Sequence, residues 1–265
     1  MGQNCVPFPR LSDKVPMEID STPNAAQPKS RRRWYQYSLR TLLIVVTLAG
    51  CGFAWLGIRV REAREQAAAV AAISGLGGIV IYDYQVDARG DPVHDAEPPG
   101  PEWLHVLLGE GFFTKVYSVY LRGDAVKDAG LEHLNALAQL EYLGLGYTQV
   151  TDASLKQLNG MARLSWLDLA GTRVTDAGLV HLQGLSQLAV LYLERTGIGD
   201  AGLDHFKGLT QLQLLNLSHT KATDSGLEHL KGLVHLKELY LMGAPVTEEG
   251  VAELRKALPD CHIVP

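Results

Sequence analysis

Residues 140–163 read LEYLGLGYTQVTDASLKQLNGMAR, and residues 164–187 read LSWLDLAGTRVTDAGLVHLQGLSQ. Both segments carry leucine at positions one, four and six and threonine at position nine. The same pattern begins again at Leu188 and at Leu212, so the period is 24 residues with no insertion. With one less regular copy at each end, six copies extend over Val116–Pro259. A fixed period of this length predicts a stack of repeated structural units.

Each copy joins a strand pattern to a helix pattern. Leu143 and Leu145, at positions four and six, alternate with other residue types, which predicts a strand with one buried face. Positions 16, 19 and 22, such as Leu179, Leu182 and Leu185, are three residues apart, and this spacing predicts a short helix. One strand and one short helix cannot bury these leucines alone, so neighbouring copies must stack to form a continuous core.

Two polar positions are expected to support the backbone. Thr175-Asp176 stands before a predicted helix, where a hydroxyl or carboxylate caps the N terminus and the negative charge is favourable. The position-nine hydroxyls are expected to satisfy buried backbone groups of the turn. They belong to Thr148, Thr172, Thr196 and Thr220.

The common form, L-x-x-L-x-L-x-x-T-x-V-T-D-A-G-L-x-x-L-x-x-L-x-x, resembles the leucine-rich repeat. The resemblance covers residues 116–265 and implies an α/β solenoid, with a parallel sheet on the concave face and short helices on the convex face. Together with Ser38–Leu43, the phrase V-T-D-A-G-L-x-H-L is similar to short bacterial membrane-anchored leucine-rich-repeat proteins. The repeats are also similar to those of F-box adaptors. An apolar segment stands where an F-box would be needed, so the adaptor function is not carried over.

Residues 41–58 contain no charged side chain. At about 1.5 Å rise per residue, a helix over Thr41–Ile58 spans roughly 27 Å, close to the thickness of a bilayer's hydrocarbon core. We therefore predict a single transmembrane helix that serves as a signal-anchor. The flank before this helix has more cations than the flank after it, which predicts a cytoplasmic N terminus and extracytoplasmic repeats. The resemblance to the bacterial proteins implies that the membrane belongs to a bacterial envelope. The cations are Lys29, Arg31, Arg32, Arg33 and Arg40 before it, against Arg59, Arg61 and Arg64 after it.

Two alternatives for this segment stay open. Leu48-Ala49-Gly50-Cys51 matches a bacterial lipobox, after which the mature protein would begin with a lipidated Cys51. A cleavable secretory signal is the other alternative. The apolar run continues from Phe53 to Ile58, where a mature lipoprotein would turn polar, and this favours an uncleaved anchor.

The chain is thus predicted to have four parts. Residues 1–40 are proline-rich, polar and basic, which is typical of a disordered tail, here cytoplasmic. Residues 41–60 form the transmembrane helix. Residues 61–115 form a juxtamembrane helix and the N-terminal cap of the solenoid, because an open hydrophobic end must be covered. Residues 116–265 form the leucine-rich-repeat domain with its C-terminal cap.

The two caps are predicted in more detail. A helix over Arg61–Leu76 is expected to bury one side, and a strand over Ile79–Tyr84 is expected to pair beside the first repeat strand, Val116–Leu121. Cys261–Val264 is expected to add a last strand. A short helix over residues 102–108 is expected to bury Trp103, Val106 and Leu107.

The candidate binding surface is the concave face. Positions three, five and seven of each copy point away from the core onto this face, and they vary while the core positions do not. Aromatic side chains there suit strands, but they are also the types that dominate protein interfaces. The predicted protein-binding residues are Tyr120, Arg122, Tyr142, Trp166, Asp168, Tyr192, Glu194, Asn216 and Tyr240.

Composition and motifs argue against other functions. Residues 59–265 carry 17 Lys and Arg against 26 Asp and Glu, which is unlike a surface for a nucleic-acid backbone. The sequence has no H-E-x-x-H, G-x-S-x-G, G-x-x-x-x-G-K-[ST] or C-x-x-C motif. We expect a non-enzymatic protein with no catalytic residues, no cofactor and no bound metal. The expected partner is a protein or an envelope polymer, and the alternative is a structural protein that associates with itself.

Overall fold

The computed structural model describes residues 39–87, 89–93 and 95–265. The chain divides into two compact units, residues 1–49 and residues 50–265. Helix α1 (Leu39–Gly75) begins in the first unit and continues into the second. Apart from Leu39 and Arg40, the predicted tail over residues 1–40 lies outside the described residues.

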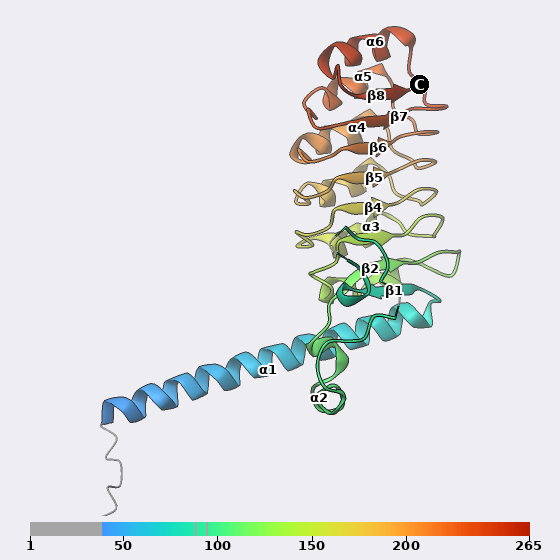
Figure 1. Ribbon diagram of the computed structural model, residues 1–265. Coiled ribbons are helices and arrows are strands. Elements are labelled where there is room, and N and C mark those ends of the chain that lie inside the picture. Colours follow the sequence, from blue (N-terminus) through green and yellow to red (C-terminus); the bar gives the residue numbers. More distant parts are fainter. Residues whose placement is uncertain (1–38, 88, 94) are drawn as a thin grey trace, which may run out of the picture. The chain divides into compact units, whose positions relative to one another are not determined.

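One sheet organises the second unit (Figure 1). Within the described residues it has eight strands, and their order in the sheet is their order in the chain. Between β2 and β8 all neighbours are parallel, and each residue pairs with the residue 24 positions later, as in Ser118 with Tyr142 and Tyr142 with Trp166. The strands are β1 (Ile79–Tyr82), β2 (Val116–Tyr120), β3 (Tyr142–Gly144), β4 (Trp166–Asp168), β5 (Val190–Tyr192), β6 (Leu214–Asn216), β7 (Glu238–Tyr240) and β8 (His262–Val264).

Short helices follow the parallel strands, as the leucine spacing predicts. Much of their length is 3₁₀ rather than α, because three residues per turn places positions 16, 19 and 22 in one row. The α-helices among them are α3 (Asp152–Leu155), α4 (Asp200–Leu203), α5 (Asp224–Leu227) and the longer α6 (Glu248–Ala257). The 3₁₀ helices are η3 (Asp128–Leu131), η4 (Leu134–Ala136), η5 (Lys156–Leu158), η6 (Asp176–Leu182), η7 (Asp204–Gly208) and η8 (Glu228–Leu230).

The predicted inward leucines form one continuous core. Leu143 and Leu145 on the strand side are 0% and 1% exposed, and Leu179 and Leu182 on the helix side are both 0% exposed. The core cluster runs from Ala69 in α1 to Ile263 in β8 without a break between repeats. Each repeat therefore depends on its neighbours for burial, which is the property that makes repeat stacks cooperative.

The position-nine threonines act as predicted. Each buried hydroxyl donates a hydrogen bond to the carbonyl three residues earlier, over 2.5 to 2.7 Å. The acceptors are the carbonyls of Leu145, Leu169, Leu193 and Leu217. These hydroxyls satisfy buried carbonyls at the strand ends. The carbonyls of Leu169 and Leu217 also accept the backbone N–H of the same threonine, at 3.3 Å.

The threonine-aspartate pair before each helix does more than the predicted capping. Thr151, Thr223 and Thr247 do accept a cap hydrogen bond from the helix, whereas the side chain of Thr175 makes none. The aspartate lies in the first turn of the helix, where its negative charge was predicted, but its carboxylate also joins one repeat to the next. The carboxylate of Asp152 accepts from the Thr175 N–H at 2.7 Å and from the Thr175 hydroxyl at 2.6 Å, 23 residues away.

This bond between repeats recurs through the stack, and we call the aspartates that make it the aspartate ladder. Its members are Asp128, Asp152, Asp176, Asp200 and Asp224, each bonded to the backbone N–H at the threonine position of the following repeat, which Gly199 occupies in one case. A carboxylate that accepts a backbone N–H bond forms a strong, charge-assisted contact. The ladder therefore fixes neighbouring repeats to each other on the helix side.

Most of the elements predicted for residues 61–115 are present. Helix α1 continues without interruption to Gly75, and Ile73 on its buried side is 1% exposed. Strand β1 pairs antiparallel with β2, with Ile79 opposite Tyr120. The predicted strand was two residues too long, because η1 (Asp83–Gln85) begins where the Gln85 side chain accepts a hydrogen bond from the Tyr82 N–H. At the other end, β8 adds the predicted last strand and places Ile263 in register with Leu239.

Helix α2 (Glu102–Leu108) corrects one prediction. Trp103, Val106 and Leu107 were expected to be buried, but they are 65%, 86% and 70% exposed. The helix is held through its other side, where the ring of His105 stacks on Phe113 with centroids 5.3 Å apart. The prediction was wrong because it assumed that every apolar helix face in the cap packs within the protein.

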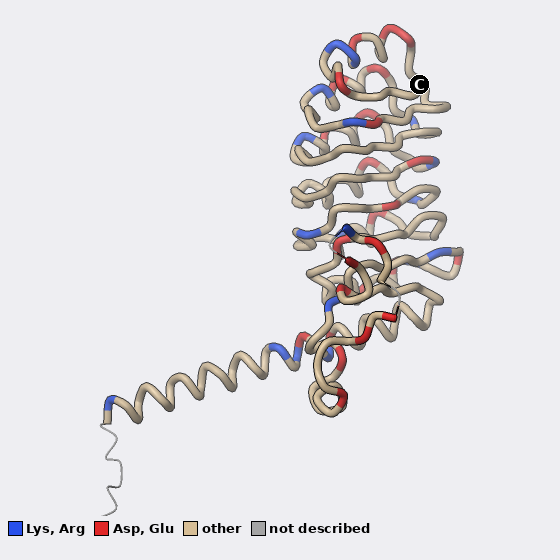
Figure 2. Tube along the Cα trace, viewed as in Figure 1, with Lys and Arg blue, Asp and Glu red and all other residues tan. Residues whose placement is uncertain are grey.

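The apolar part of α1 is exposed to the surroundings. An 18-residue window of this helix has mean hydropathy 2.1, none of it is buried, and by length and composition it can cross a membrane. Figure 2 shows no charged residue along α1 between Arg40 and Arg59. A membrane anchor and a signal sequence both have these properties.

Candidate functional site

The face of β2–β7 opposite the core is the candidate site, and we call it the open sheet face. It is lined by positions three, five and seven of the repeats, the positions predicted to face outward. Trp166 and Asp168 on β4 are half-buried, while Leu167 between them is 0% exposed. The alternation of buried and half-buried residues therefore places the predicted site residues on one surface.

Five aromatic side chains meet on this face, and we call them the aromatic cluster. Their ring centroids are 5.0 Å apart for Tyr117–Tyr142, 6.3 Å for Tyr142–Trp166, 6.0 Å for Tyr120–Trp166 and 5.7 Å for Trp166–Tyr192. Aromatic contacts at these separations each contribute about 0.5–1.5 kcal/mol beyond simple burial. The cluster is thus a rigid apolar platform across strands β2–β5.

Gly144 makes room for the platform. A Cβ atom at this position would lie 2.7 Å from the Tyr120 ring and 3.6 Å from the Trp166 ring. The absence of a side chain between Tyr120 and Trp166 therefore allows the two rings to meet.

Acidic side chains lie beside the aromatic cluster. Burial raises the pKa of the Asp168 carboxyl above its usual value, although the Ala170 N–H donates to it at 2.8 Å and favours the charged form. Glu194 accepts from the Tyr147 hydroxyl at 3.0 Å and from the Asn216 amide at 2.6 Å. The face combines aromatic rings with fixed carboxylates, a combination suited to cationic and apolar groups.

Position eight of each repeat forms a strained edge beside this face. Tyr147, Arg195 and His219 have φ of 57°, 55° and 55°, in the left-handed region, and Gly123, Gly171 and Gly243 occupy the same position in the other repeats. Left-handed backbone at residues other than glycine is a strained conformation that concentrates at functional sites. Tyr147 is 54% exposed and reaches Glu194 two repeats further along the chain.

The predicted site residues do not all come together. Tyr120, Tyr142, Trp166 and Tyr192 are members of the aromatic cluster. Tyr240 lies on β7, where its hydroxyl donates to Glu238 at 2.8 Å.

The polar residues of the predicted site differ in exposure. Arg122 is exposed just beyond β2. Asn216 is 8% exposed, and its side chain is bonded both to Glu194 and to the Ser218 N–H. Asp168 and Glu194 are half-buried next to the cluster.

Sequence reasoning missed Tyr117 and Tyr147. Tyr117 sits at position two of the first repeat, outside the positions considered, and burial together with its hydrogen bond to Tyr142 raises the pKa of its hydroxyl. Tyr147 sits at position eight, where glycine in three other repeats was the available signal of a left-handed turn.

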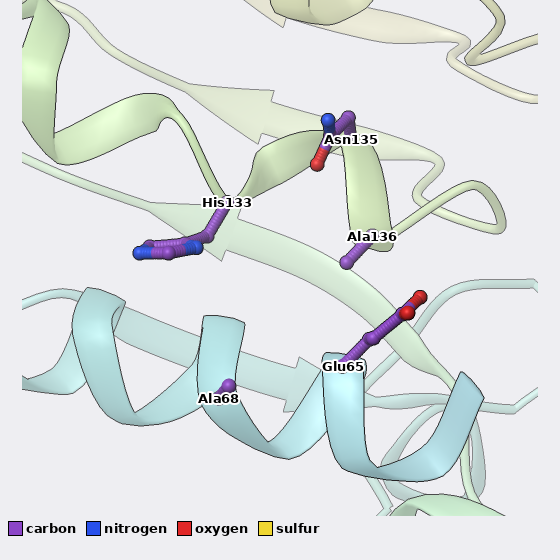
Figure 3. A pocket seen from close by; sticks show the side chains of 5 residues that line it. All are labelled: Glu65, Ala68, His133, Asn135 and Ala136. Carbon is purple, nitrogen blue, oxygen red and sulfur yellow. The ribbon is translucent and has the colours of Figure 1, made fainter. Parts of the chain in front are cut away.

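A cleft of about 440 Å³ lies elsewhere, between α1 and the first repeat (Figure 3). It is lined by Glu65, Ala68, His133, Asn135 and Ala136. Glu65 is held in an ion pair with Arg61 at 2.7 Å. Among the described residues, no group of three or more His, Cys, Asp or Glu side chains is arranged to hold a metal ion.

One comparison with known proteins identifies the part of the chain that it matches. Residues 186–245 match the family model described as leucine rich repeat. No relative matches among curated proteins.

Three of the similar solved structures come from bacteria. An internalin C2 from Listeria monocytogenes is 24% identical, with a TM-score of 0.45 over 56% of this chain and 70% of that one. The Listeria internalin inlF is 22% identical, with a TM-score of 0.44 over 50% of this chain and 36% of that one. A leucine-rich-repeat protein of Leptospira interrogans is 22% identical, with a TM-score of 0.39 over 49% of this chain and 38% of that one. The chain thus spans little more than a third of inlF and of the Leptospira protein.

Proposed function

We propose that this protein is a membrane-anchored recognition module. The proposal starts from residues 186–245, which match the leucine rich repeat family. In this proposal, six 24-residue repeats form a solenoid over residues 116–259, and its open sheet face binds another protein. Thr41–Ile58 crosses the membrane once, with the N terminus in the cytoplasm and the repeats on the extracytoplasmic side. The observation that carries the binding proposal is the aromatic cluster with its neighbouring carboxylates.

The chemistry of the face favours a protein segment that presents cationic and apolar groups. Trp166 and Tyr192 are half-buried and fixed by their contacts, so little side-chain entropy is lost when a ligand covers them. Trp and Tyr are enriched among the residues that dominate binding energy. Asp168 and Glu194 add negative charge to the same surface and would pair with lysine or arginine of the ligand.

Alanine substitution tests this proposal. Trp166→Ala and Tyr192→Ala in the full-length, detergent-solubilised protein are expected to weaken capture of the partner at least tenfold each, in line with a loss of about 1.4 kcal/mol or more at an interface anchor. Val180→Ala is the matched control, because Val180 is 43% exposed on η6, on the helix side. Equal capture by all three variants would contradict binding through the open sheet face.

Self-association is the second candidate, favoured by the end of the sheet. Within the described residues, β8 is a terminal strand that pairs only with β7. A terminal strand offers free backbone groups to another chain. In this alternative, the protein is a structural component of the envelope, and the same Trp166→Ala and Tyr192→Ala variants are expected to retain their self-association.

The mode of membrane attachment has its own alternative. Cys51 is a free, exposed cysteine within α1, at the position of the lipobox cysteine. A lipoprotein would be cleaved before Cys51 and lipidated there. If the anchor is uncleaved, the Cys51→Ser protein is expected to stay attached to the membrane. Its mass is expected to differ from that of the unsubstituted chain only by the substitution. If the unsubstituted protein is a lipoprotein, its measured mass will lack the mass of residues 1–50 and will include the mass of a lipid. That result would establish the lipoprotein instead of the anchor.

A further inference from the structure

The exposed apolar face of α2 lies close to the place where the proposed membrane helix leaves the bilayer. Trp103, Val106 and Leu107 are spaced i, i+3 and i+4 and form one face of the helix. Their exposures of 65%, 86% and 70% resemble those of Phe53 and Trp55 on α1, at 75% and 59%. Beyond α1 and α2, the exposed large apolar residues lie singly in different parts of the second unit, so this face is the exception.

The segment after α2 is fixed against α1 at the end of its apolar run. In η2 (Glu110–Phe112), the ring of Phe112 meets Trp55 edge to face at 6.4 Å, and the Arg59 guanidinium lies 5.8 Å from its centroid. Gly111 approaches so closely that an added Cβ would lie 2.9 Å from the Ala63 carbonyl oxygen. The contacts of η2 therefore fall on residues 55–63 of α1, around the first charged residue after the apolar run.

Helix α2 contacts η2 and is separated from it by Gly109 alone, so the contacts of η2 with α1 also set the level of α2 along α1. At about 1.5 Å rise per residue, Trp55 and Arg59 are separated by roughly 6 Å along the helix axis. Tryptophan and arginine are the side chains typical of the boundary between acyl chains and headgroups. A bilayer that surrounds Thr41–Ile58 would have its surface at this level.

We infer that α2 lies in the surface of the same bilayer that α1 crosses, with Trp103, Val106 and Leu107 inserted among the lipids. This inference rests on the proposed membrane anchor but not on its orientation. Glu102 begins α2 and Glu110 begins η2. Their charged side chains keep the segment over residues 102–110 at the level of the lipid headgroups. The occupant of the face is therefore lipid, and α2 gives the repeat domain a second membrane contact beside α1.

The experiment places an environment-sensitive fluorophore on single cysteines of the full-length protein in nanodiscs of phosphatidylcholine and phosphatidylglycerol. The background replaces the native cysteines by Cys5→Ser, Cys51→Ala and Cys261→Ala, and a thermal melt checks that each variant folds. The probe sites are Val106→Cys, Leu48→Cys in the proposed span and Val234→Cys, which is 72% exposed on a distant repeat. Leu107→Cys replaces Val106→Cys if that variant does not fold.

The inference predicts that emission at position 106 shifts to shorter wavelength and is quenched by doxyl-labelled lipid, as at position 48 but not at position 234. In the pair Trp103→Ser with Leu107→Ser, quenching at position 106 is expected to be lost. Quenching at 48 without quenching at 106 would overturn the inference and leave the membrane anchor standing. No quenching at 48 would overturn the anchor, and the inference with it. A blue shift at 106 that grows with protein concentration, without lipid quenching, would identify a second copy as the occupant and overturn the inference.

Discussion

The residue at position eight of each repeat affects the free energy of unfolding through its backbone angle φ. At Gly171, φ is 63°, and a Cβ atom would meet the Tyr147 ring at 2.7 Å. Gly171→Ala is expected to lower the free energy of unfolding by roughly 1–2 kcal/mol for the left-handed backbone, with the steric contact adding to the loss. Chemical denaturation measures this change. Gly184→Ala is the control, because a Cβ atom there would meet nothing within 4 Å, and an equal loss in both variants would contradict the explanation.

The buried threonine hydroxyls make a second contribution at the scale of single residues. Thr196 is 7% exposed, and its hydroxyl donates to the Leu193 carbonyl at 2.5 Å. Thr196→Val keeps the shape of the side chain but leaves a buried carbonyl without this donor, which costs about 1–3 kcal/mol. Denaturation of this variant is compared with that of Thr210→Val, where the threonine is exposed. A Thr196→Val protein as stable as the parent would show that the carbonyl finds another donor.

At the scale of elements, two members of the aspartate ladder, Asp224 and Asp128, make the stack sensitive to acid. Hydrogen bonds from the Thr247 backbone N–H and hydroxyl lower the pKa of Asp224 below its usual value of 3.8. For Asp128, burial acts to raise the pKa, but bonds from Ser154 and Thr151 outweigh it and the net shift is downward. Because the folded-state pKa is lower than the unfolded one, this stabilisation is complete above pH 3.8 and is lost as the pH falls through the folded-state values.

The corresponding prediction concerns the slope of stability against pH. Asp224→Asn is expected to lower the free energy of unfolding at pH 7. It is also expected to reduce the additional free energy of unfolding that is lost when the pH falls below about 4. Denaturation curves measured at a series of pH values give both quantities. Combining Asp224→Asn with Thr247→Val should cost less than the sum of the two single changes, because both remove the same contact. Strict additivity would mean that the two side chains act independently.

The elements also show how far sequence reasoning reaches. The 24-residue period fixes the sheet register, and leucine spacing identifies the buried side of each strand and helix, since both are local patterns. The charge of Asp152 at the helix start was predicted, but its bond to Thr175 was not, because Thr175 is 23 residues away and the capping rule considers only the helix that follows. The exposure of Trp103 was missed because an apolar pattern identifies a face but not what covers it.

The candidate site was predicted in part for similar reasons. Strand alternation placed Tyr142 and Trp166 on the same face, where their rings lie 6.3 Å apart. It did not reveal Tyr117, which belongs to a less regular first repeat, or the turn that brings Tyr147 to Glu194. Contacts between repeats depend on side-chain directions at strand ends, which the alternation of buried and exposed positions does not determine.

At the scale of the whole molecule, the proposed topology has a direct consequence. With the repeats outside the cytoplasm, protease added to intact spheroplasts is expected to digest the repeats and to spare a tag placed before residue 1. Immunoblots against the tag and against the repeats show whether each is digested. Lysed spheroplasts provide the control in which the protease reaches both. Loss of the tag with the repeats protected would reverse the proposed orientation.

Site-specific photo-crosslinking in intact membranes shows whether the open sheet face holds another protein, as we propose. A photoreactive amino acid is placed at position 166 in the aromatic cluster, or at position 180 on η6, and adducts are identified by mass spectrometry. We expect position 166 to yield adducts with a different polypeptide, Tyr192→Ala to diminish these adducts, and position 180 to yield none. Adducts at position 166 only with a second copy of this chain, or equal adducts at both positions, would contradict it.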